Sequence, residues 1–175
     1  AFVAKHKTHG DPATDILPGV IYRVWGPTLH PVAENQRVLT FIEALQAGVH
    51  GDPEALSVAG EMMYEAHESY RDNCRLSTPE VDFLVEMARE IGARKGLYGA
   101  KITGGGAGGT VAVFGTKTAL AKHLPDMARE YARKIGARPD IFAGTSPGGI
   151  EWGPRRLNLG AGLRLARADG TQRAR

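Results

Sequence analysis

The part of the sequence best suited to chemistry is a run from Gly104 to Gly109, where five of six residues are glycine. Each glycine gives up side-chain packing and loses more chain entropy on folding than any other residue. Such a run is therefore typical of a backbone that adopts positive φ angles, or that lets another group approach its N–H donors closely. The stretches on either side, residues 97–103 and 110–114, have the composition of strands. The pattern predicts a hairpin loop whose N–H groups can form an anion-binding nest, with a plain hairpin turn as the alternative.

Two common phosphate-binding motifs do not fit this loop. A P-loop needs Gly-Lys-Ser/Thr at the start of a helix, and the sequence contains no such tripeptide here. Gly104, Gly106 and Gly109 match the spacing G-x-G-x-x-G, and Asp126 follows Gly106 by 20 residues. The dinucleotide fingerprint requires a helix directly after the glycines, whereas residues 110–114 read as a strand. A Rossmann-type site is therefore not predicted.

Few other side chains have the spacing of a site. Strand alternation places Lys101 and Thr103 on one face, where Lys101 either adds positive charge near a bound anion or is simply exposed. The histidines show no ligand spacing such as i, i+4 on one helix, and Cys74 has no recognisable activating base. No metal site is predicted.

The elements expected to position the loop follow from hydrophobic periodicity and from capping residues. They are a short strand over residues 22–25, a helix from Pro31 to Gly48, a helix over 53–72 capped by Asp52, a helix from Pro79 to Gly92 capped by Thr78, the strands 97–103 and 110–114, a helix ending at Gly136 and restarted or kinked at Pro125, and a short strand at 141–142. This order predicts an α+β fold: a two-layer sandwich of an antiparallel sheet of about four strands with helices on one face.

Composition sets the remaining limits. A chain of 175 residues that is 42% hydrophobic suits one folded domain, and no apolar run is long enough to span a membrane. One cysteine excludes an internal disulfide and favours a reducing compartment, which predicts a cytoplasmic protein. Residues 151–175 carry six arginines against two acids, while residues 1–150 are nearly neutral. We expect a loop over residues 1–19, a domain over 20–153 and a solvated Arg/Gly-rich tail over 154–175.

Several stretches together resemble a known family. Residues 98–110, Tyr-Gly-Ala-Lys-Ile-Thr-Gly-Gly-Gly-Ala-Gly-Gly-Thr, look like the third signature motif of the GHMP kinases. The resemblance extends from about Tyr22 to Gly153 and is greatest to the C-terminal halves of galactokinases and L-arabinokinases, carried by residues 22–24, 30–32, 34–38, 63–70 and 141–148. Lys101 and Ala107 stand where galactokinases usually have Arg and Phe, which favours the arabinokinase-like branch.

The resemblance implies a ferredoxin-like C-terminal domain of an ATP-dependent sugar kinase. Its substrate would be an L-arabinose- or galactose-like monosaccharide, phosphorylated at the anomeric hydroxyl. The glycine loop would face the phosphate loop of an N-terminal domain, which would hold most contacts to ATP and Mg²⁺ and all catalytic residues. The residues expected to support the phosphate loop are Lys101, Thr103, Gly104, Gly105, Gly106, Ala107, Gly108 and Gly109.

The Ser-rich phosphate loop of that N-terminal domain does not occur in these 175 residues. The sequence is therefore expected to be a piece of a longer kinase, inactive without its N-terminal domain, with that domain and a monosaccharide as partners and with no membrane partner. The alternative is a stand-alone α+β module that binds RNA or another anionic ligand. Tyr98 and Phe114 are the strand aromatics available for base stacking, but they lack the surrounding RNP-type pattern, so nucleic acid is not expected.

Overall fold

The computed structural model describes residues 4–5, 10, 13, 15–106 and 109–144. The chain divides into two units, residues 1–140 and 141–175, and the elements below belong to the first. They are the helices α2 (Trp25–Val49), α3 (Pro53–Ser69), α4 (Pro79–Ile91) and α5 (Lys117–Ile135), the short helices η1 (Tyr70–Cys74) and η2 (Ala93–Lys95), and the strands β1 (Leu97–Thr103) and β2 (Thr110–Gly115).

Three of the helices begin at a residue whose side chain caps the first turn. The Asp52 carboxylate accepts hydrogen bonds from the backbone N–H groups of Glu54 and Ala55, so it caps α3. The Thr78 hydroxyl accepts from Val81 N at the start of α4, and α5 is capped in the same way by Thr116. The caps predicted at Asp52 and Thr78 are therefore confirmed.

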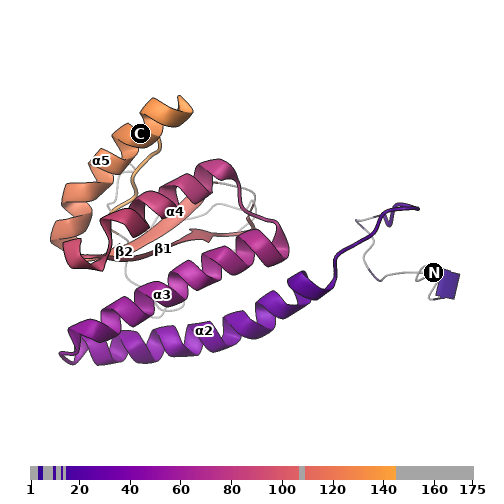
Figure 1. The fold of residues 1–175 in the computed structure, drawn as a ribbon, viewed down its shortest axis with the longest axis horizontal. Helices are drawn as coiled ribbons and strands as arrows, with labels where there is room; N and C mark the ends of the chain where they lie inside the picture. The colour runs from indigo at the N-terminus through magenta and orange to yellow at the C-terminus, as the bar shows by residue number, and fades with distance from the viewer. Residues whose placement is uncertain (1–3, 6–9, 11–12, 14, 107–108, 145–175) are drawn as a thin grey trace, which may run out of the picture. The chain divides into compact units, whose positions relative to one another are not determined.

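The sheet is an antiparallel pair of β1 and β2, with Ile102 opposite Val111 and Thr103 opposite Thr110. Together with the helices, this sheet confirms the α+β class. In Figure 1, α4 crosses the sheet, while α3 runs beside β1 and α2 runs along the outer side of α3. The main hydrophobic core lies between the strands and the helices α3, α4 and α5, and comprises Tyr64, Val85, Met87, Ala88, Leu97, Ala100, Ala119 and Met127.

Two of the expected strands are wrong. Residues 22–24 form no strand, and Trp25 already begins α2. The prediction took Pro27 as the end of a strand, but a proline in the first helical turn costs nothing because N–H groups there have no partner within the helix. Ile141 and Phe142 also form no strand, and both are exposed. The sheet therefore has two strands in the described part of the chain, rather than about four.

Two helix boundaries predicted at prolines, at Pro31 and at Pro125, are also wrong. The helix expected from Pro31 begins six residues earlier, so Pro31 lies inside α2. The helix restart expected at Pro125 is wrong, because Pro125 lies inside one uninterrupted α-helix, Lys117–Ile135. The helix expected over 53–72 is an α-helix as far as Ser69 and continues as the π-helix η1.

Candidate functional site: the glycine loop and its supports

The glycine loop joins β1 to β2, as predicted, and three of its glycines need a backbone conformation that other residues rarely adopt. The φ angles are +77° at Gly104, +86° at Gly106 and +110° at Gly109. Ala107 and Gly108 lie outside the described residues. Positive φ angles turn successive N–H groups in ways that side-chain-bearing residues resist, which is the backbone geometry expected of an anion-binding nest.

The glycines differ in what a side chain would meet. A Cβ at Gly104, Gly105 or Gly109 would meet no non-neighbouring atom within 4 Å among the described residues. A Cβ at Gly106 would lie 2.6 Å from Cβ of Leu76 and 2.8 Å from Cε1 of Tyr70. Within the part of the chain that the structure describes, the loop is thus open on one side and packed against Tyr70 and Leu76 on the other.

Tyr70 forms the polar part of that contact. Its hydroxyl donates a hydrogen bond of 3.1 Å to the carbonyl oxygen of Gly104. Its ring meets the imidazole of His30 edge to face, with the centroids 5.0 Å apart. The sequence did not single out Tyr70, because Tyr70 and Gly104 are 34 positions apart and such a separation leaves no periodic signal of the contact.

Lys101 and Thr103 lie on one face of β1, as strand alternation predicted. The Thr103 hydroxyl donates to the backbone oxygen of Thr110 across the start of the loop, at 3.3 Å. Lys101 Nζ lies 2.8 Å from Oε1 of Glu34 on α2. The lysine therefore belongs to an ion pair in which both side chains are half-buried.

Glu34 is the centre of a small charge network. Its other carboxylate oxygen accepts from Arg37 at 2.9 Å, and Arg37 also lies 3.5 Å from Glu65 on α3. Burial alone would raise the pKa of Glu34, but the hydrogen bonds and charges of Lys101 and Arg37 hold it below its ordinary value. Glu34 is therefore ionised at neutral pH. The network borders a mostly apolar pocket of about 230 Å³, which is lined by Glu34, Arg37, Val38, Phe41, Met62, Met63, Ala66 and Lys101.

A second buried contact fixes β1 just before the loop. The ring of His67 on α3, buried with its residue only 2% exposed, accepts a hydrogen bond at Nδ1 from the backbone N–H of Ile102. Its Nε2 lies 3.1 Å from Oδ1 of Asp82 on α4. Burial lowers the pKa of His67 despite the nearby Asp82 carboxylate, so the imidazole is neutral, and Nε2 carries the proton because Nδ1 is an acceptor.

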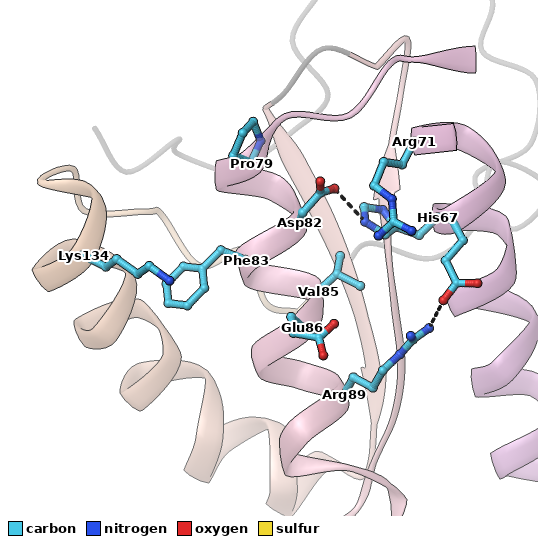
Figure 2. A pocket seen from close by; sticks show the side chains of 10 residues that line it. His67, Arg71, Pro79, Asp82, Phe83, Val85, Glu86, Arg89 and Lys134 are labelled. Atoms are coloured by element: carbon cyan, nitrogen blue, oxygen red, sulfur yellow. Dashed lines mark hydrogen bonds and ion pairs between the residues drawn. The ribbon is translucent and has the colours of Figure 1, made fainter. Parts of the chain in front are cut away.

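His67 and Asp82 both line a pocket of about 300 Å³, whose other lining residues also come from α3, η1, α4 and α5 (Figure 2). Its cationic side chains already have partners within the chain. Arg71 pairs with Asp72, Arg89 pairs with Glu68, and Lys134 lies over the ring of Phe83. Of these contacts, the Arg89–Glu68 pair joins α4 to α3 by charge, and Lys134 joins α5 to α4 through the Phe83 ring.

The described residues contain no group of three or more His, Cys, Asp or Glu side chains able to hold a metal ion. Burial raises the pKa of the Cys74 thiol, and the charge of Glu34 raises it further, so the thiol is less reactive than a free cysteine. None of the helices in the described part of the chain is long and apolar enough to cross a bilayer.

Comparison with known proteins agrees with this geometry. The sequence profile of the family described as GHMP kinases C terminal matches residues 41–134, which is more than half of the chain. The chain belongs to this family of kinase C-terminal domains.

Its relatives include sugar kinases. It is 36% identical over 163 residues to an L-arabinokinase of Arabidopsis thaliana, covering 89% of this chain and 15% of the relative. It is 35% identical over 121 residues to a galactokinase of Mannheimia succiniciproducens, covering 69% of this chain and 29% of the relative. Among solved structures it is similar to Lactococcus lactis galactokinase complexed with galactose, with a TM-score of 0.53 and 27% identity over 62% of this chain and 26% of that one. The chain thus spans less than a third of these relatives.

Proposed function

We propose that this chain is the C-terminal domain of an ATP-dependent sugar kinase. The kinase would transfer the γ-phosphoryl group of ATP to the anomeric hydroxyl of an L-arabinose- or galactose-like monosaccharide. One observation carries the proposal: a glycine hairpin with an open side, held on the sheet of a chain that is 36% identical over 163 residues to an L-arabinokinase. The greater extent of that match, 89% of this chain against 69% for the galactokinase, favours L-arabinose as the first sugar to test.

The chemistry that the loop can supply is positional. Phosphoryl transfer depends mainly on alignment and on neutralising charge, for which preorganised backbone N–H donors are well suited. As far as the described residues go, the open side at Gly104, Gly105 and Gly109 leaves room for a phosphate oxygen, or for the loop of a facing domain, to approach the backbone. Mg²⁺ would neutralise the charge of the transferring phosphate groups when it is bound with ATP.

The residues of this chain do not fit all of those tasks. Among the described residues there is no carboxylate cluster suited to Mg²⁺, and Lys101 is held by Glu34. ATP, Mg²⁺ and the catalytic residues are therefore assigned mainly to an N-terminal domain, the principal partner of this chain. We assign Gly104, Gly105, Gly106, Ala107, Gly108 and Gly109 to support of the phosphate loop in that domain, with Thr103 as a hydroxyl neighbour and Lys101 as an indirect support through Glu34.

The RNA-binding alternative is disfavoured by the positions of the strand aromatics. The rings of Tyr98 and Phe114 lie 5.4 Å apart, and Phe114 lies 6.2 Å from Phe41 of α2. Both residues are partly buried, so they do not offer the free ring faces that base stacking needs.

The test is a comparison of two polypeptides: this chain alone, and this chain preceded by the sequence encoded upstream of it. ADP release is measured with L-arabinose, galactose and a sugar blocked at the anomeric position, and ³¹P NMR identifies the product. We expect ADP release and a sugar 1-phosphate from the longer polypeptide with an unblocked sugar, and neither ADP release nor tight Mg-ATP binding from the chain alone. Absence of sugar-dependent ADP release from the longer polypeptide would overturn the kinase proposal, and micromolar Mg-ATP binding by this chain would overturn the assignment of ATP to another domain.

A further inference from the structure

The connection between α3 and α4 has an unusual backbone. Residues Tyr70–Cys74 form the π-helix η1. Arg75 follows with a φ of +59°, a left-handed conformation that residues other than glycine rarely adopt. The Leu76 N–H closes the segment by donating to the backbone oxygen of Tyr70 at 3.2 Å. Both features are uncommon, and short π-helical turns occur frequently at functional sites. The strain indicates that the surrounding contacts hold this segment in place.

The segment meets the glycine loop at two points. The Tyr70 hydroxyl donates to the carbonyl oxygen of Gly104, and the side chain of Leu76, together with the Tyr70 ring, lies against Gly106. Leu76 and Tyr70 lie six residues apart in the sequence, and the widened turn between them brings both to the same loop. The two glycines that they contact have positive φ angles.

A polar cluster of His30 on α2, Ser69 on α3 and Asn73 in η1 lies next to Tyr70. His30 Nδ1 lies 3.0 Å from the Ser69 hydroxyl oxygen, which accepts a hydrogen bond from Nδ2 of Asn73 at 2.9 Å. Because that oxygen is already an acceptor, its one proton is free to be donated to His30 Nδ1, which requires a neutral imidazole. Burial lowers the pKa of His30, in agreement with this assignment. The imidazole and the Tyr70 ring then meet in a T-shaped arrangement.

We propose that Tyr70 is a positioning residue for the glycine loop. Its hydroxyl fixes the peptide after Gly104, and its ring, with Leu76, fixes Gly106, so that the open side of the loop keeps one orientation. The structural part of this proposal stands on the contacts of this chain. Its consequence for catalysis rests on the proposed kinase function.

The test replaces one hydroxyl. Tyr70→Phe keeps the ring against Gly106 and His30 but removes the donor to Gly104. Tyr131→Phe is the matched control, because Tyr131 on α5 stacks on Phe83 and its hydroxyl has no hydrogen bond to the described residues. Amide hydrogen exchange of residues 104–106 is measured in the 175-residue chain, together with the thermal midpoint. Steady-state kinetics with Mg-ATP and L-arabinose are measured in the longer polypeptide.

We expect Tyr70→Phe to speed amide exchange in residues 104–106 and to lower kcat by about fivefold, the typical effect of one hydrogen bond, with KM for the sugar and the thermal midpoint little changed. Tyr131→Phe should change neither exchange in the loop nor kcat. Unchanged exchange in Tyr70→Phe would overturn the positioning contact, whether or not the protein is a kinase. If the wild-type enzyme is active, faster exchange in Tyr70→Phe with a kcat equal to that of the wild type would overturn the catalytic consequence alone. An inactive wild-type polypeptide would overturn the proposed function and leave the exchange result to decide the contact.

Discussion

The backbones of Gly60 on α3 and Gly99 on β1 lie in direct contact. A Cβ on Gly60 would lie 1.9 Å from the carbonyl oxygen of Tyr98, and a Cβ on Gly99 would lie 2.6 Å from the carbonyl oxygen of Gly60. No side chain separates the helix from the strand at this point, so β1 runs close enough to α3 for His67 to reach Ile102 N. The position of the glycine loop after β1 thus depends on two glycines outside the loop.

Gly60→Ala should therefore destabilise the fold by about 3 kcal/mol, the upper end for overpacking, because the clashing atoms are backbone rather than a flexible side chain. The free energy of unfolding in urea measures this effect. Gly105→Ala is the control, since its added methyl group would meet no non-neighbouring atom within 4 Å among the described residues. It should change stability by less than about 0.5 kcal/mol. Equal stability of Gly60→Ala and wild type would contradict the close packing of α3 on β1.

Much of this arrangement could be predicted from the sequence, because its signals are local. The caps at Asp52 and Thr78, the periodicity of α4 and the glycine loop between two strands each depend on residues that lie close together in the sequence. The start of α2 was predicted wrongly for a reason that is also local. A proline such as Pro27 is compatible both with the end of a strand and with the first turn of a helix.

The supports of the loop could not be predicted in the same way. Lys101 pairs with Glu34 across 67 residues, and Ile102 bonds to His67 across 35. Such contacts depend on how helices pack on the sheet, and periodicity gives only the face on which each residue lies. Residues 34–38 carry part of the family resemblance, but the ion pair between Glu34 and Lys101 of β1 depends on the fold.

The open and the packed sides of the loop predict different results for two glycines. In the longer polypeptide, Gly105→Val should fold normally and lower kcat/KM by about 100-fold, because a branched side chain would fill the space needed near the phosphate groups. Gly106→Val should in addition lower the thermal midpoint, because of its φ of +86° and its contact with Leu76. Thermal midpoints and kcat/KM are measured for both variants. Full activity in Gly105→Val would mean that the loop is a structural turn.

The buried His67 predicts a pH-dependent stability. Its folded pKa is lowered by burial, with Asp82 opposing and Arg71 and Arg89 adding to the shift, while the unfolded value is near 6.5. The unfolded chain then binds more protons between these two pKa values, so stability is fully present above about pH 6.5 and falls as the pH is lowered toward the folded pKa. Unfolding in urea at pH 7.5 and 5.5 measures this loss.

His67→Gln should be less stable at both pH values and should lose less stability between pH 7.5 and 5.5 than wild type. Part of the loss should remain, because burial lowers the pKa of His30 in the same direction. His50→Gln is the control, since His50 is exposed at the end of α2. An unchanged pH dependence in His67→Gln would show that this histidine is not the group responsible.

The pair of Lys101 and Glu34 predicts an asymmetry between its two members. Lys101→Ala leaves Glu34 with Arg37, and should cost about 1 kcal/mol of stability. Glu34→Ala removes the shared acceptor of two half-buried cations, and should cost more, about 2 kcal/mol.

If Lys101 acts only through Glu34, both variants of the longer polypeptide should lower kcat/KM by similar small factors, and the double variant should be no worse than Glu34→Ala. If instead Lys101 neutralises phosphate charge directly, Lys101→Ala alone should lower kcat/KM by about 100-fold while Glu34→Ala does not. Urea denaturation and steady-state kinetics of the two single variants and the double variant distinguish these outcomes, because the double-mutant cycle isolates the coupling between the two side chains.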